Sequence, residues 1–320
     1  MDLNCTHDKF YKEYPYRILA VLYYYSVVKR EQLPDELFYI IIRIRKYLTE
    51  EMLASEEVRE LIRTVFAGDR AYEFVKVLEE VELLELVFPN IYALIKIDGG
   101  HYHNETVYSH VLGALRALRN VNVPWFVKLA ALYHDCGKQK YEDFEDGRRR
   151  FSNHATSGAF FVECDLRRFK FDEGTVNTLK ILVLYHMSHL NDGNEIHVKS
   201  LRKVKTVFEE NNIPFKYFFW VRYADNMGSA KKKTNFMYYW GIYKRALQKL
   251  NPPREPSISD LKINGSNLIE DFGLTQGRVI GYVLKKLFNQ WQASEIENVK
   301  EVLESKVRDL INEFNELYKQ

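Results

Sequence analysis

Apolar residues recur at the spacing of an α-helix through most of this 320-residue chain. Positions i, i+3, i+4 and i+7 fall on one face of a helix, so each such run predicts an amphipathic helix with one buried side. Strict alternation of apolar and polar residues, which indicates a half-buried strand, is almost absent. The helical runs are residues 17–28, 35–48, 55–66, 70–87, 105–118, 125–134, 155–169, 174–187, 198–210, 216–227, 237–250, 276–291 and 294–317. The sequence therefore predicts an all-α fold.

Residues that interrupt helices divide these runs into three groups. Pro89 and the pair Gly99-Gly100 close the first group, and the lysine run 231–233 opens the third. We expect one helical region at residues 1–98, a multi-helix bundle at 99–230 and a C-terminal helical region at 231–320. The sequence shows no internal repeat and no low-complexity tract. Within the bundle, the segment 141–151 contains Asp146-Gly147, a pair that predicts a tight hairpin turn.

Composition limits the class of protein and its compartment. Hydrophobic residues make up 46% and charged residues 28% of the chain, which is enough for a packed core. The formal net charge of +2 argues against a protein that coats nucleic acid, although it leaves room for a local basic patch. Cys5, Cys136 and Cys164 form no CxxC pair, so we expect reduced thiols. With no signal-peptide pattern and no uncharged apolar window of membrane length, we expect a cytoplasmic protein without a membrane partner.

The feature most suggestive of chemistry is the pair His134-Asp135. Seven of the nine histidines lie between His101 and His189, and this pair ends the apolar helical run 125–133. Gly137 follows directly, and a glycine there ends the helix and exposes its last side chains. Adjacent helical residues point about 100° apart, so both side chains can reach one ion bound at the helix end. An imidazole and a carboxylate together suit a divalent transition metal.

Other helical runs supply further candidate ligands: His110, His154, His186 and Asp225. A single histidine on a helix is more often a surface residue or a hydrogen-bonded core residue than a ligand. We leave His101 and His103 with that interpretation, and His189 stays undecided. Asp225 is harder to explain in that way, because it follows the largely aromatic segment 215–223 and a buried carboxylate there needs a cation or several hydrogen bonds.

The order His110, His134-Asp135, Asp225 resembles the H…HD…D signature of the HD-domain metal-dependent phosphohydrolase superfamily. Three stretches are similar, more narrowly, to the bacterial CCA-adding enzyme and poly(A) polymerase family. They are HNETVYSHVLGALRAL, then LAALYHDCGKQK with DGRRRFSNHATSGA, and finally ISDLKINGSNLIEDFGLTQGRVIGYVLKKL. The early stretch EYPYRILAVLYYYS resembles the start of that family's helical neck. The sequence contains no counterpart of the family's nucleotidyltransferase head or of its intact templating motif, so we do not expect nucleotide addition.

This resemblance implies a neck-like region at 1–98, an HD phosphohydrolase domain at 99–230 and the family's C-terminal helices at 231–320. It also implies one or two divalent ions (Mn, Fe, Ni, Co, Zn or Mg). The first ion would be held by His110, His134, Asp135 and Asp225. His154 and His186 match the positions that hold a second ion in two-metal members, with Asp135 bridging. Lys138 lies just beyond the helix end, where it can contact a phosphate oxygen or simply remain a solvated lysine.

The expected reaction is hydrolysis of a phosphate ester on an RNA 3′ end (2′,3′-cyclic, 2′ or 3′ phosphate) or on a nucleotide, with tRNA as a candidate partner. Arg148, Arg149 and Arg150, and the lysines 231–233, are basic runs that can guide RNA, although such runs are usually only solvated. Two alternatives stay open: an RNA- or tRNA-binding protein with a degenerate site, and a small-nucleotide hydrolase. The sequence does not fix the metal, the ester, the oligomeric state or the existence of a separate head protein as partner.

Overall fold

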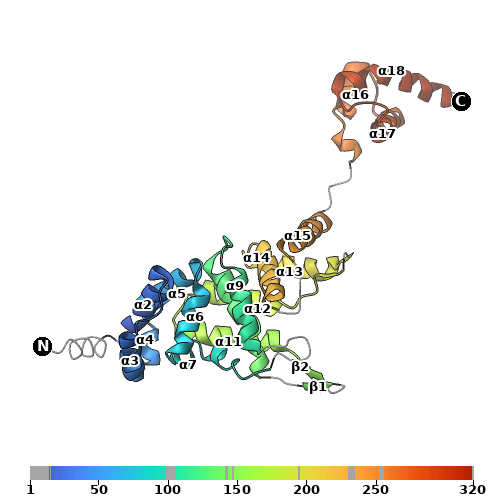
Figure 1. Cartoon of the computed structure of the whole chain (residues 1–320). Helices are drawn as coiled ribbons and strands as arrows, with labels where there is room; N and C mark the ends of the chain where they lie inside the picture. Colours follow the sequence, from blue (N-terminus) through green and yellow to red (C-terminus); the bar gives the residue numbers. More distant parts are fainter. Residues whose placement is uncertain are drawn as a thin grey trace. The chain divides into compact units, whose positions relative to one another are not determined.

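The computed structural model describes residues 14, 16–98, 106–140, 143–145, 148–193, 195–229, 235–251 and 256–318. The chain forms two compact units, Met1–Asn251 and Pro252–Gln320 (Figure 1). The unit boundary falls after the helix that the sequence analysis placed first in the C-terminal region. The three-part division at 98/99 and 230/231 stays a prediction about functional regions.

The first unit is helical, as the 3.6-residue periodicity predicts (Figure 1). Its elements are α2 (Arg17–Tyr23), the π-helix η1 (Tyr24–Lys29), α3 (Asp35–Ile44), the 3₁₀ helix η2 (Arg45–Tyr47), α4 (Glu50–Leu53), α5 (Glu56–Ala67), α6 (Ala71–Glu80), α7 (Leu84–Val87), α8 (Pro89–Tyr92), α9 (Val107–Ala117), α10 (Trp125–Tyr133), the 3₁₀ helix η3 (Cys136–Gln139), α11 (His154–Arg168), α12 (Glu173–Tyr185), α13 (Val198–Glu210), α14 (Lys216–Gly228) and α15 (Phe236–Leu250). Side-chain caps begin several of them: Ser55 accepts from the Val58 amide and Asp172 from the Thr175 amide.

β-Structure in the described residues is limited to two short hairpins and one isolated bridge. Strand β1 (Asp143–Glu145) pairs antiparallel with β2 (Arg148–Arg150), which confirms the predicted hairpin, although its turn lies outside the described residues. Strand β3 (Asn191–Asp192) pairs with β4 (Glu195–Ile196). The prediction of an all-α fold class is confirmed.

Helix α10 lies at the centre of the first unit. It packs against α5, α9, α12 and α14, and every residue from Val127 to Tyr133 is buried. A helix this apolar can be placed only in a core, and its one charged group, the ammonium of Lys128, donates to the Gly68 carbonyl. The residues that follow its last turn, His134 and Asp135, are therefore also inside the unit, at 0% and 3% exposure.

Two glycines allow α9 and α14, which both pack against α10, to cross each other at close range. A Cβ atom on Gly113 would lie 2.9 Å from the carbonyl oxygen of Gly228, and one on Gly228 would lie 2.7 Å from the carbonyl oxygen of His110. Side chains at either position would push the helices apart. The close crossing brings His110 of α9 next to Asp225 of α14.

A network of buried hydrogen bonds holds the end of α10 in place. The Tyr133 hydroxyl donates to Asp165 Oδ2 at 2.6 Å, and the Asn90 amide donates to Asp165 Oδ1 at 2.9 Å. Burial raises the pKa of the Asp165 carboxyl, although its contacts with Tyr133, Arg168 and Asn90 oppose that rise. These bonds join α8, α10 and α11, so they fix the direction in which the chain leaves α10.

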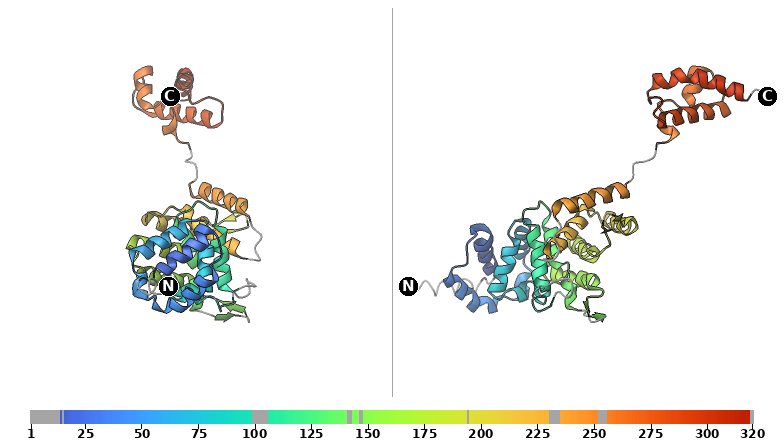
Figure 2. Two further views of the ribbon diagram at one scale, coloured as in Figure 1. Left: turned by 60° about the vertical axis from the view of Figure 1, so that its left-hand side comes forward. Right: turned by 45° about the vertical axis from the view of Figure 1, so that its right-hand side comes forward.

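The second unit contains the 3₁₀ helix η4 (Ile258–Asp260), α16 (Gly265–Phe272), α17 (Arg278–Gln292) and α18 (Lys300–Leu317). Figure 2 shows its three α-helices, in orange to red, packed on one another. Their shared core is formed by Leu261, Ile263, Leu268, Val283, Leu287, Leu303, Val307 and Leu310. Across the described residues of both units, no helix combines the length and the apolar character needed to cross a membrane.

Candidate metal centre

Six potential metal ligands from five helical segments meet in the first unit. His110 lies on α9, His134 and Asp135 follow α10, His154 begins α11, His186 follows α12 and Asp225 lies on α14. These are the six residues that the sequence analysis selected as ligands, and the structure brings them all together. Two groups able to hold an ion result, His110–His134–Asp135 and Asp135–His154–His186.

The first group closes around the Nε2 atoms of two histidines. His110 Nε2 lies 3.1 Å from His134 Nε2 and 3.2 Å from Asp225 Oδ1. Asp135 Oδ2 is 3.6 Å from His110 Nε2 and 3.4 Å from His134 Nε2. Two imidazoles and one oxygen of Asp135 thus form the group, and Asp225 Oδ1 lies beside both imidazoles, 3.6 Å from His134 Nε2.

The second group uses the other oxygen of the same aspartate. Asp135 Oδ1 lies 3.3 Å from His154 Nε2 and 3.6 Å from His186 Nε2. The two Nε2 atoms are 3.4 Å apart. Asp135 thus belongs to both groups, with Oδ2 in the first and Oδ1 in the second.

Three of the histidines are oriented by the same kind of hydrogen bond, from Nδ1 to the backbone carbonyl three residues earlier. His134 Nδ1 lies 2.7 Å from the Ala131 carbonyl, His154 Nδ1 2.8 Å from that of Phe151, and His186 Nδ1 2.6 Å from that of Val183. A carbonyl can only accept, so each Nδ1 carries the proton and donates it. The remaining Nε2 is then left to act as a ligand, which is how metal-binding histidines are usually held.

These distances fit bound divalent ions. Two nitrogen or oxygen donors that each lie about 2.1 Å from one ion are themselves about 3.0–3.5 Å apart. The pairs in both groups fall in or close to that range. The facing Nε2 atoms of His154 and His186, 3.4 Å apart, are at the spacing of two ligands of one cation.

The side chains of the site form a cluster of charged groups that is buried away from water. Burial lowers the pKa of His134, but the carboxylates of Asp135 and Asp225 outweigh it and raise that pKa to about 10. Burial also lowers the pKa of His186, to about 4. Burial alone would raise the pKa of the Asp135 carboxyl, but Lys138 and His134 hold it well below its usual value. An ion that binds at His134 therefore competes with a proton for the ring nitrogen.

Two cations contact the ligand carboxylates from outside. Lys138 Nζ lies 2.6 Å from Asp135 Oδ2, and Arg222 Nη1 donates to Asp225 Oδ2 at 3.0 Å. Lys138, which the sequence predicts as a phosphate contact or a solvated lysine, lies against Asp135. Arg222 was not predicted, although its three-residue spacing from Asp225 places both residues on one helix face.

The other candidates fall outside this cluster or outside the described residues. His189 is exposed and its ring lies 4.0 Å, centroid to centroid, from that of His197. Arg148, Arg149 and Arg150 form β2, which ends shortly before His154. Residues His101 and His103 and the lysines 231–233 lie outside the described residues.

Comparison with known proteins agrees with this geometry. Residues 107–206, which contain His110, His134, Asp135, His154 and His186, match the HD domain family. The CC-adding tRNA nucleotidyltransferase of Thermus thermophilus is 28% identical over 242 residues, which cover 74% of this chain and 53% of that protein. The A-adding tRNA nucleotidyltransferase of Deinococcus radiodurans is 25% identical over 252 residues, or 78% of this chain and 57% of that protein.

The chain thus spans a little over half the length of these curated relatives. The similarity to them is distant but extends over most of the chain, as the sequence resemblance predicts. The matched region contains five of the six histidine and aspartate side chains of the site, all of them buried, and Asp225 lies beyond it. This chain contains an HD domain with an intact His/Asp cluster, the arrangement expected of an HD-type metal-dependent phosphohydrolase.

Proposed function

We propose that this protein hydrolyses phosphate esters at RNA 3′ ends (2′,3′-cyclic, 2′ or 3′ phosphates) or on nucleotides, using one or two divalent ions. The observation that carries the proposal is the position of Asp135, whose two oxygens face two different groups of imidazoles. A carboxylate placed in this way is suited to bridge two ions, and paired ions are common in enzymes that cleave phosphate esters.

Each ion would have its own set of ligands. His110, His134, Asp135 and Asp225 would hold the first, and Asp135, His154 and His186 the second. When bound, Mn, Fe, Ni, Co, Zn or Mg would lower the pKa of a water and neutralise charge on the phosphate. The hydrogen bonds from Nδ1 of His134, His154 and His186 keep the ligand atoms in place before any ion arrives.

Lys138 is one of two cations that contact the ligand carboxylates of this site. Its side chain is 10% exposed and its ammonium group contacts Asp135. From there it can hold a phosphate oxygen or keep Asp135 charged and in position. We expect Lys138→Ala to lower phosphate release by about 10- to 100-fold, the usual range for a residue that supports a metal ligand.

The matched control for that variant is Lys140→Ala, since Lys140 is an exposed lysine two residues away. Steady-state rates and metal content of both variants give the test. A Lys138→Ala enzyme as fast as the Lys140→Ala enzyme would remove Lys138 from the proposed site.

RNA ends are the first substrates to examine. Three consecutive arginines form β2, just before the helix that His154 begins, and the relatives are named for their action on tRNA. The test is a panel of RNAs that end in 2′,3′-cyclic, 2′ or 3′ phosphates, assayed beside the corresponding mononucleotides. Faster release from RNA ends supports the proposal. Equal turnover of mononucleotides would favour a small-nucleotide hydrolase, and tight tRNA binding without metal or turnover would favour a non-catalytic RNA-binding protein.

A further inference from the structure

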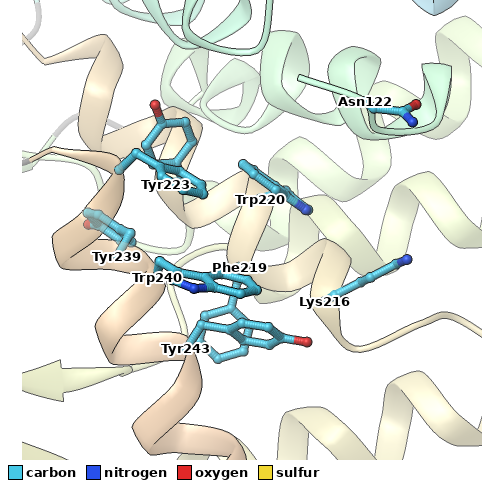
Figure 3. Close-up of a pocket in the computed structure, with 9 residues that line it drawn as sticks. Asn122, Lys216, Phe219, Trp220, Tyr223, Tyr239, Trp240 and Tyr243 are labelled. Carbon is cyan, nitrogen blue, oxygen red and sulfur yellow. The ribbon is translucent and has the colours of Figure 1, made fainter. Parts of the chain in front are cut away.

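An aromatic pocket lies on the first unit, formed mainly by α14 and α15. Its volume is about 300 Å³, within the range of small-ligand sites. Figure 3 shows Trp220 of α14 and Trp240 of α15 facing the same space, with Tyr223 and Tyr239 at one side. Lys216 and Asn122 lie at the side away from these tyrosines (Figure 3).

The rings of this pocket are arranged to receive another flat ring. Phe236 is nearly parallel to both tryptophans, at 16° to Trp220 and 15° to Trp240, with centroids 5.9 and 6.1 Å away. Phe236 is 42% and Trp240 37% exposed, although both are large and apolar. Exposed parallel ring faces in a concave site are suited to stacking against a planar ligand.

The charges around the pocket select an anionic ligand. None of the nine described residues that line the pocket is acidic. Lys216 lines the pocket, and Lys244 Nζ lies 5.5 Å from the centre of the Trp240 ring. A cationic ligand such as a quaternary ammonium would be repelled by these groups, whereas a phosphate-bearing ligand would be attracted.

The pocket is a different site from the metal centre. Successive helical residues turn by about 100°, which places Trp220 about 140° and Lys216 about 180° around α14 from Asp225. The metal ligand and the aromatic pocket are therefore on different faces of one helix. A ligand in the pocket would be held without touching the six metal-centre residues.

We propose that this pocket binds an unpaired nucleobase of a single-stranded RNA, with the ring stacked on Trp240, Phe236 and Trp220 and the adjoining phosphates near Lys216 and Lys244. Interleaved aromatic and basic residues are the usual means by which proteins hold single strands. The Asn122 amide can donate to and accept from a base edge. The site would hold RNA at a point remote from the ester that is cleaved.

The test is the affinity of the full chain for a fluorescent single-stranded RNA of mixed sequence, measured by anisotropy in the presence of a chelator. Neither bound metal nor turnover enters this measurement, so its outcome is separate from that of the proposed hydrolysis. Stacking is worth about 1–3 kcal/mol per base, so Trp240→Ala and Phe236→Ala should each weaken binding by about 5- to 100-fold. A strand of equal length with abasic positions should bind wild type correspondingly less well.

Tyr39→Ala is the matched control, because Tyr39 is an aromatic residue of the same unit, is 70% exposed and lies on α3. We expect it to bind RNA like wild type. Quenching of tryptophan fluorescence by RNA, which needs no variant, should accompany binding. Wild-type affinity in both Trp240→Ala and Phe236→Ala, or equal affinity of wild type for the abasic strand, would overturn the proposal.

Discussion

Asp135→Asn should lower the rate of phosphate release by about 10³-fold or more and remove bound metal from both groups of ligands. Asparagine has nearly the same size but lacks the negative charge that Oδ1 and Oδ2 offer to two sets of imidazoles. Loss of a metal-centred site removes about 4 kcal/mol or more of transition-state stabilisation, which corresponds to that factor. The measurement is kcat/KM on the best ester of the panel, with metal content determined on the same sample.

Asp165→Asn is the matched control for that variant. Asp165 is also a buried carboxylate, 3% exposed, but it bonds to Tyr133 and Asn90 and belongs to neither ligand group. Because an amide oxygen can still accept the bond from Tyr133 that fixes the end of α10, we expect this variant to lose some stability but to keep its metal and most of its activity. If Asp135→Asn kept wild-type metal content and rate, Asp135 could not be the shared ligand.

Gly137→Ala should lower the free energy of unfolding by about 3 kcal/mol and weaken the second ligand group. A Cβ atom at this position would lie 1.9 Å from the carbonyl oxygen of His154 and 2.5 Å from the amide nitrogen of Gly158. Both are backbone atoms of α11, so the start of that helix would have to move. His154, its first residue, would then move away from Asp135. Denaturant titration and metal stoichiometry measure the two effects.

The same substitution at Gly241 shows what an added methyl group does where there is room. Gly241 lies inside α15 of the same unit, and its Cβ would meet only the end of the Arg245 side chain, at 3.5 Å. Alanine is the better helix former, so Gly241→Ala should leave stability unchanged or raise it by up to about 1 kcal/mol. Equal unfolding midpoints for the two variants would show that α11 does not pack against Gly137 as described.

Part of the ligand set could be predicted from local signals, whereas His110, His154 and His186 were selected because they match the resemblance to the HD-domain superfamily. His134 and Asp135 directly follow an almost entirely apolar helix, which ends at Tyr133. Asp225 stood out because a carboxylate beside a run of aromatic residues needs a partner. Each of these signals is contained within a few residues.

The contacts that support the site depend on residues far apart in sequence. The close crossing of α9 and α14 requires Gly113 and Gly228 together. The sequence around one of these glycines does not show that it packs against the other. The bond from Tyr133 to Asp165 likewise joins α10 to α11. The aromatic pocket arises from the pairing of α14 with α15, whereas the sequence showed only an aromatic segment before Asp225. Helical periodicity predicts that faces are buried but not which faces meet.

The most direct test of the central claim is metal removal and return. The purified protein would be analysed for metal, stripped with a chelator, assayed on the ester panel, and assayed again after each candidate ion is added back. We predict metal in the purified protein, loss of phosphate release after chelation, and recovery with at least one ion in wild type but not in Asp135→Asn. Phosphate release that continues undiminished in the stripped protein, or that no ion restores in a correctly folded wild type, would contradict a metal-dependent phosphohydrolase.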